Sequence, residues 1–250
     1  RRSYVLRTCR CNAVNCLVNR HLPPPVNVLS CELPRDPVLR DAIRAAYAAH
    51  DVRARERWER KWPAAKLDAI RRSQRDDEDK PWAVELAVKR EGSHKRPTKA
   101  RGIQGYANLA TQARFGPEHM CFQEALADVF GRDGGYELYP GVRVAITCGW
   151  RSSDYDAWAA DAPPGWLYRE RDGANWDGSM QHGHFAAKYW YMRGCSRGLA
   201  EHVARGGNAR GRCRQEPFFK YSTNGTVKSG HNDTTSGNSL INALISAAVC

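Results

Sequence analysis

Residues 82 to 106, WAVELAVKREGSHKRPTKARGIQGY, constrain the fold most, because two short strand-like segments flank a loop whose charged residues are almost all basic. The basic side chains of this loop oppose a single acid, Glu91, and they are Lys89, Arg90, Lys95, Arg96, Lys99 and Arg101. Like charges packed this closely repel one another unless an anion lies against them. The segment therefore predicts a strand, a loop that faces an anionic partner, and a second strand.

The charge of the whole chain points in the same direction. Its 250 residues include 39 Lys and Arg against 27 Asp and Glu, a net charge of +12. Residues 1 to 125 hold 25 basic and 15 acidic side chains, so +10 of the +12 lies in the first half. Such a balance favours nucleic acid or an acidic membrane surface as partner, although an ordinary solvated surface remains the alternative on charge alone. The length allows one large domain or two modest ones.

Cysteine content and hydropathy favour a reducing, cytoplasmic setting. Nine cysteines are too few for a disulfide framework at this length, and no apolar run approaches the ~20 residues of a membrane span. The start of the chain carries no secretory signal pattern. One group could hold zinc, but its spacing fits no tight paired-cysteine pattern, which favours free thiols: Cys9, Cys11, Cys16, His21 and Cys31.

Helical and strand patterns alternate along the chain, which predicts an α+β fold. Residues 35 to 62 predict one helix ended by Pro63, with Asp36 as N-cap and Pro37 at the first helical position. Further helices are expected at 64–74, at 116–131, after Asp177 and from about Thr234. A short strand is expected at 166–171, and residues 204–214, ARGGNARGRCR, are expected to form a basic loop.

Two aspartates lie five positions apart in DGANWD, where the predicted strand gives way to a helix: Asp172 and Asp177. A strand end can project a carboxylate into a cleft, where a hard cation such as Mg²⁺ takes carboxylate and phosphate oxygens. The same two residues could instead be a turn former and a helix N-cap. This spacing alone leaves both interpretations open.

The stretch SGHNDTTSGN, residues 229 to 238, precedes an apolar helical pattern. Gly230 in the loop can bring backbone N–H groups close to a sugar or phosphate. Thr234 and Asn238 are four residues apart, so they lie on one face of the helix. An ordinary Ser/Gly turn before a capped helix would look similar.

In this order, the basic loop, D-x4-D and S-G-x3-T-x3-N resemble motifs F, A and B of the RNA-dependent RNA polymerases of positive-strand RNA viruses, closest in style to the tombus-like and noda-like groups. The resemblance covers residues 82 to 250. It implies that Asp172 ligates the catalytic Mg²⁺ ions, with Mn²⁺ as an alternative metal. It also implies that Asp177 and Asn238 read the 2′-OH of the incoming ribonucleotide.

The remaining site residues follow from the same resemblance. Ser229 and Gly230 would form a flexible loop near the template and the nascent base pair, and Thr234 would lie on the helix that follows. Lys89 and Arg101, together with Lys99, would neutralise the triphosphate. The reaction implied is in-line transfer of a ribonucleoside monophosphate to an RNA 3′-OH, helped by two metal ions.

The fold implied is a right-hand polymerase with fingers and a partial palm, whose antiparallel sheet is incomplete and carries packed helices. The fingers would comprise residues 1–165, with the basic loop at 89–103, and an insertion at 188–227. The palm would comprise 166–187 and 228–250. The partners implied are the RNA template and product, ribonucleoside triphosphates, and other replication proteins at host membranes in the host cytoplasm.

The family's motif C, a Gly-Asp-Asp turn that follows motif B, is missing, since the chain ends twelve residues after Asn238. We therefore expect a fragment that needs the remaining C-terminal part of the polymerase and does not polymerise RNA alone. One alternative is a non-catalytic basic RNA-binding viral protein, nucleoprotein-like or capsid-like, which would leave Asp172, Asp177 and Asn238 unexplained. Another is a reverse transcriptase, although such enzymes place a bulky residue where Asp177 stands.

Overall fold

The computed structural model describes residues 5, 9–22, 32–73, 80–90, 100, 102–131, 135–161, 165, 176–214 and 219–248. Ten helices lie in these residues: α1 (Arg10–Arg20), α2 (Pro37–His50), α3 (Ala54–Glu59), α4 (Ala64–Ser73), α5 (Leu109–Val129), α6 (Ser152–Ala160), α7 (Trp176–Ser179), α8 (His182–Cys195), α9 (Arg197–Gly206) and α10 (Asp233–Ala248). Six strands accompany them: β1 (Ala83–Val88), β2 (Gly102–Tyr106), β3 (Tyr136–Tyr139), β4 (Val142–Val144), β5 (Ala209–Cys213) and β6 (Lys220–Thr223). The α+β class expected from the sequence is confirmed.

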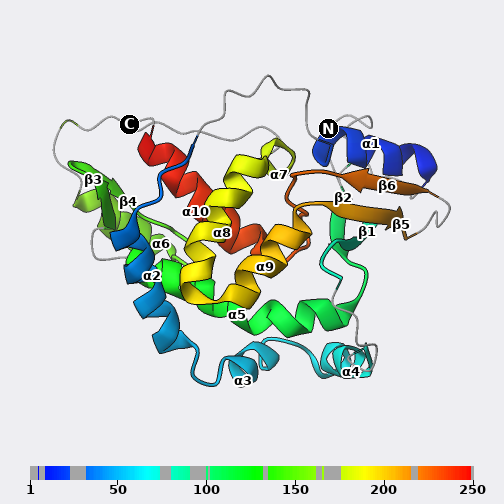
Figure 1. Cartoon of the computed structure of the whole chain (residues 1–250), viewed down its shortest axis with the longest axis horizontal. Helices are drawn as coiled ribbons and strands as arrows, with labels where there is room; N and C mark the ends of the chain where they lie inside the picture. The colour runs from blue at the N-terminus through cyan, green and yellow to red at the C-terminus, as the bar shows by residue number, and fades with distance from the viewer. Residues whose placement is uncertain are drawn as a thin grey trace.

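The larger sheet has the strand order β2-β1-β5-β6 (Figure 1). The two strands predicted around the basic loop are present as β1 and β2, an antiparallel pair in which Val84 lies opposite Tyr106. β1 also pairs with β5 in parallel, and β5 pairs with β6 antiparallel. The sheet is therefore mixed, and it joins segments more than 100 residues apart. The antiparallel palm strand expected at 166–171 lies outside the described residues.

The expectation of a basic loop at 204–214 is wrong, because this stretch forms the end of α9, a turn and β5. Burial alternates along β5: Ala209, Gly211 and Cys213 are buried, whereas Arg210 and Arg212 are exposed. This period of two is that of a strand with one covered face. The small buried residues and the many arginines hid the pattern, since neither type has a strong preference for strands.

One face of this sheet is covered by α1, which packs Ala13, Cys16 and Leu17 against Leu86 and Val88 (Figure 1). The arginines of β5 alternate with its buried residues and therefore belong to the opposite face. On β5 and β6 this second face carries Arg210, Arg212, Lys220 and Ser222.

The main hydrophobic core is formed by α2, α5, α8, α9 and α10 together with the β3–β4 hairpin (Figure 1). As the sequence predicts, Asp36 caps α2, accepting a hydrogen bond of 2.8 Å from Val38 N. Leu39, Ile43 and Tyr47 form the buried stripe of this helix. Helices before and after the sheet strands thus share one core, which fixes α7 and α10 relative to the rest of the chain.

The single helix expected over residues 35–62 is divided in two. α2 ends at His50, and Arg53 adopts a left-handed conformation with φ of 54° before α3 begins. The break redirects the chain so that Trp58 packs in a separate cluster with Ile70 and Met120. A straight helix would have continued along the α2 axis, so burial of Trp58 outweighs the strain at Arg53.

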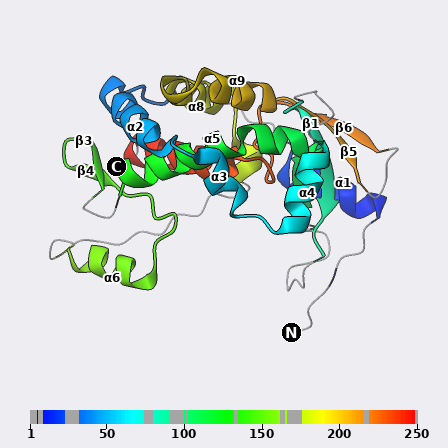
Figure 2. The same ribbon diagram turned by 90° about the horizontal axis from the view of Figure 1, so that it is seen from below.

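α6 lies to one side of the helices around α5 and buries none of its residues (Figure 2). Within the described part of the chain, no helix combines the length and the apolar character needed to cross a bilayer.

Candidate functional site

The centre of the candidate site is a direct contact between Asp177 and Asn238, which are 61 positions apart. Asn238 Nδ2 on α10 donates a hydrogen bond of 2.9 Å to Asp177 Oδ1 on α7. Asp177 lies within the short helix α7 rather than ahead of a helix, and α8 begins only at His182. The contact between Asp177 and Asn238 that the resemblance implies is thus present. The helix that carries Asn238, α10, begins at Asp233, one residue before the expected start at Thr234.

The amide of Asn238 is only partly satisfied by this contact. Its Oδ1 is buried and accepts no hydrogen bond from any described residue. A buried amide oxygen without a donor is unfavourable by about 1–3 kcal/mol. The amide oxygen of Asn238 therefore keeps the capacity to accept a hydrogen bond, beside the Asp177 carboxylate.

The loop at Ser229 and Gly230 lies against β2, the strand that follows the basic loop. Ser229 Oγ accepts a hydrogen bond of 3.3 Å from Gln104 N. Gly230 N donates to Gln104 O at 2.8 Å, and Gly230 forms a parallel bridge with Gly105. The structure therefore brings the third predicted motif into contact with the strand that borders the first.

Only a glycine fits at position 230. A Cβ built there would lie 2.7 Å from Gln104 O and 2.9 Å from Gly105 Cα. Both neighbours are backbone atoms, which cannot rotate away. Gly105, on the other side of the same bridge, has nothing within 4 Å of such a Cβ.

Thr234 closes this loop from within. Its Oγ1 lies 2.9 Å from both Lys228 O and His231 O, to which it donates. Thr234, expected from its spacing to share a helical face with Asn238, thus uses its hydroxyl proton within the loop itself. Of these two residues, Asn238 is the one with hydrogen-bonding capacity to spare.

A buried ion pair holds the start of α10. Lys188 Nζ on α8 donates to Asp233 Oδ2 at 2.7 Å, and both side chains are buried. Burial by itself would raise the pKa of Asp233, but the charge of Lys188 outweighs it, so the pKa lies well below its usual range. Gly237 makes room for the pair, because a Cβ there would lie 2.8 Å from Lys188 Cδ.

A second buried lysine anchors the segment just before the loop. Lys228 Nζ donates to Gly207 O at 2.5 Å and to Thr226 O. Burial lowers the pKa of Lys228 to about 7, although Asp233 opposes this shift. The neighbouring Val227 N donates to Asp177 O at 3.0 Å, so the same segment fixes the backbone of the candidate site.

Three buried histidines lie in contact around Tyr106. His231 stacks on the Tyr106 ring at 4.1 Å, and His202 Nε2 lies 2.7 Å from its hydroxyl. His119 meets His202 edge to face at 5.6 Å. Burial lowers the pKa of His119 to about 4, of His231 to about 3 and of His202 to about 2, so all three are neutral near pH 7. They act as packing groups under the loop.

Several predicted site residues cannot be placed. Asp172, Lys99 and Arg101 lie outside the described residues, as do most of the basic loop and Cys31 of the cysteine cluster. Lys89 is half-buried just after β1. Among the described residues, no group of three or more His, Cys, Asp or Glu side chains could hold a metal ion. Asp177 alone does not make a Mg²⁺ site, so the fit to this metal depends on Asp172.

Sequence reasoning missed Lys188, Lys228 and Gln104. A signal existed for Lys188, since it stands inside the apolar helical run HFAAKYWYM, where a lysine requires a buried partner. Gln104 contributes through its backbone, which no residue-type pattern can reveal.

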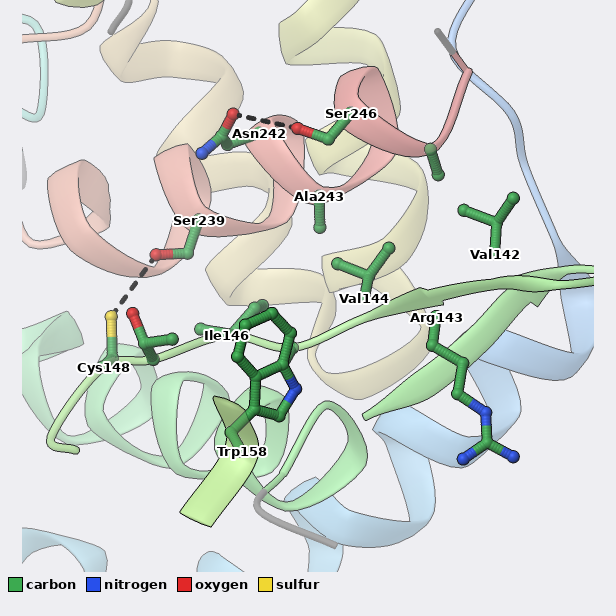
Figure 3. A pocket seen from close by; sticks show the side chains of 13 residues that line it. Val142, Arg143, Val144, Ile146, Cys148, Trp158, Ser239, Asn242, Ala243 and Ser246 are labelled. Carbon is green, nitrogen blue, oxygen red and sulfur yellow. Dashed lines mark hydrogen bonds between the residues drawn. The ribbon is translucent and has the colours of Figure 1, made fainter. Parts of the chain in front are cut away.

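A separate cavity of about 340 Å³ lies further along α10. Figure 3 shows Ser239, Asn242 and Ser246 of α10 on one side, with Val144 and Ile146 on the other. Cys148 Sγ lies 3.5 Å from Ser239 Oγ. The lining contains no carboxylate and one cation, Arg143, so it lacks the groups needed for metal or acid–base chemistry.

The geometry therefore supplies a hydrogen-bonded pair of Asp177 and Asn238, a loop bound to β2, and two buried lysines that hold both in place. Comparison with known proteins gives no relative: no protein-family model matches the chain, and no curated protein matches it. The function must accordingly be argued from the residues of the site themselves.

Proposed function

We propose that this chain is part of an RNA-directed RNA polymerase and that Asp177 and Asn238 sense the ribose of the incoming nucleotide. The observation that carries the proposal is the 2.9 Å hydrogen bond between Asn238 Nδ2 and Asp177 Oδ1, which joins the two predicted palm motifs. The contact of Ser229 and Gly230 with β2 supports it, because it brings the strand next to the basic loop beside the same site.

The chemistry of this pair suits a 2′-hydroxyl. A hydroxyl both donates and accepts, and the pair offers the Asp177 carboxylate, the unfilled Asn238 Oδ1 and the amide hydrogens. A deoxyribonucleotide would leave these buried polar groups unpaired, which disfavours its binding. The arrangement thus favours a ribonucleotide over its deoxy analogue.

Binding of Mg²⁺ and of the triphosphate belongs to the same proposal. Asp172 would hold the metal, which when bound stabilises charge on the phosphate oxygens. Lys89, Lys99 and Arg101 would lie near the triphosphate. The contribution that the described residues make is positional: Val227 N holds Asp177 O at 3.0 Å, and the pair of Lys188 with Asp233 holds the start of α10.

The test is equilibrium binding of ATP and dATP to the purified chain in the presence of MgCl₂. We expect ATP to bind up to about tenfold more tightly, the equivalent of one good hydrogen bond. Asn238→Ala should bring the ratio of the two affinities close to one. Asn242→Ala, one turn further along α10 and exposed, is the matched control and should keep the preference.

Two outcomes would reject the proposal. Equal binding of ATP and dATP by the unmodified chain would favour a reverse transcriptase or a protein that does not sense ribose. An unchanged ratio in Asn238→Ala would show that the pair is only a structural contact. A non-catalytic RNA-binding protein, in turn, would bind RNA as well or better after Asp172→Ala and show no Mg²⁺ dependence of nucleotide binding.

A further inference from the structure

Two adjoining hollows run along β5 and β6 of the four-stranded sheet. Their volumes are about 680 and 690 Å³, and both are lined by Arg210 and Ser222. The first extends from Trp82 and Arg205 to Asn224, and the second lies over β1, β5 and β6. Because they share lining residues, we treat them as one feature, the β5–β6 groove.

The β5–β6 groove is strongly basic. Its cations are Arg205 at the end of α9, Arg210 and Arg212 on β5, and Lys220 on β6, and no acidic residue lines either hollow. Glu85 on β1 lies opposite Arg212 and accepts hydrogen bonds of 3.0 and 2.6 Å from it. Neither Arg210 nor Lys220 forms an ion pair with any described residue. The groove thus carries at least two positive charges that no acid offsets.

A flat ring system accompanies these charges. The Arg205 guanidinium lies over the Trp82 ring, 4.7 Å from its centroid. The Tyr221 ring, by contrast, lies over Gly211 on the α1 side of the sheet and packs against the core there, so it belongs to the covered face. Aromatic rings and arginine planes beside cationic side chains are the combination on which single-stranded nucleic acids bind, through stacking and phosphate contacts.

The residue composition of the groove disfavours a membrane surface. A bilayer binds through exposed apolar side chains together with basic ones. None of the residues that line the two hollows is among the exposed large apolar residues of the described chain.

The groove leads toward the candidate site. It ends at Asn224, and three residues later Val227 N binds Asp177 O at 3.0 Å. The turn between them is held by Gly225 N, which donates to Asn208 Oδ1 at 3.2 Å. A strand lying in the groove would therefore run along β5 and β6 and reach the neighbourhood of Asp177.

We propose that the β5–β6 groove binds the phosphate backbone of single-stranded RNA, with Arg210 and Lys220 as phosphate contacts. This deepens the proposed function, on which it rests for the choice of RNA as the polyanion. The sheet edge involved is the one opposite β2, so this RNA contact is separate from the loop at Ser229 and Gly230.

The test measures fluorescence anisotropy of a labelled single-stranded RNA of about 12 nucleotides, within the site sizes known for single-strand binders. The double variant Arg210→Ala with Lys220→Ala is compared with Arg72→Ala with Arg193→Ala. All four side chains are exposed, and both doubles remove two positive charges. Circular dichroism confirms that each variant is folded.

We expect the groove variant to bind at least about tenfold more weakly, and its log–log salt slope to fall by about 1.4, or 0.7 for each lost phosphate contact. The control should stay within about twofold of the unmodified chain. Equal losses in both doubles would overturn the proposal, since overall charge would then explain binding. So would unchanged RNA binding together with lost binding to phosphatidylserine vesicles.

The two proposals can fail separately. Loss of RNA binding in the groove variant with no ATP preference in the unmodified chain would support the groove and reject the ribose-sensing role. The reverse pattern, a clear ATP preference with RNA binding indifferent to Arg210 and Lys220, would reject the groove alone.

Discussion

Replacing Gly230 by alanine tests the contact between the loop and β2, because the structure provides a matched control in the same bridge. The new Cβ would lie 2.7 Å from Gln104 O, so the loop must move away from the strand. It then loses the 2.8 Å bond from Gly230 N to Gln104 O and the 3.3 Å bond between Gln104 N and Ser229 Oγ. With about 0.5–1.5 kcal/mol for each bond, the expected loss of stability is about 1–3 kcal/mol.

The assay is urea denaturation followed by tryptophan fluorescence, together with thermal unfolding. For a chain of this size, each kcal/mol lowers Tm by about 2–4 °C. Gly105→Ala places its methyl group where nothing lies within 4 Å, so we expect a change within about 0.5 kcal/mol. Hydrogen exchange at the Gly230 amide should also become faster in Gly230→Ala. Equal effects of the two substitutions, or no effect of Gly230→Ala, would refute the close contact as a determinant of the loop.

Two other predictions concern the buried charges and rings beneath this loop. Lys188→Met leaves Asp233 buried without its cation and should destabilise the fold by about 3–5 kcal/mol in urea titrations. The double variant Lys188→Met with Asp233→Leu should recover most of that stability, because no buried charge is then left unpaired. A double variant no more stable than Lys188→Met alone would contradict this. The three buried histidines have pKa values of about 4, 3 and 2, below the ordinary 6.5, so the unfolded chain binds more protons as pH falls below 6.5 and stability declines. The free energy of unfolding should fall by about 4 kcal/mol per pH unit near pH 5, because three protons are taken up on unfolding. His119→Leu removes one of these protons and should reduce that slope by about a third. A free energy of unfolding that does not change between pH 7 and pH 5 would rule this out.

Much of the local structure could be predicted because its causes lie within a few residues. Asp36 and Pro37 begin α2 through a side-chain cap and a fixed φ, and both act on adjacent backbone groups. The strands on either side of the basic loop followed from their own composition. The spacing of Thr234 and Asn238 placed them on one helical face, and the order of the motifs led to the contact of Asn238 with Asp177.

Other predictions were wrong, or were not made, because the structure at those positions depends on residues that are distant in the chain. β5 is a strand because β1 and β6 supply its hydrogen bonds, although its own residues are small or basic. The break at Arg53 exists because Trp58 is buried among residues of α4 and α5. In both cases tertiary contacts outweigh a weak local preference.

The candidate site combines these two kinds of determinant. The residue types and their spacing, including a carboxylate, an amide and a glycine with suitable neighbours, can be read from the sequence. The contact of Gly230 with Gln104, the ion pair of Lys188 with Asp233, and the groove that Arg210 shares with Lys220 arise from tertiary packing. Hydrogen bonds and ion pairs depend on distances of a few ångströms, and such distances between remote segments are set by how the helices and strands pack.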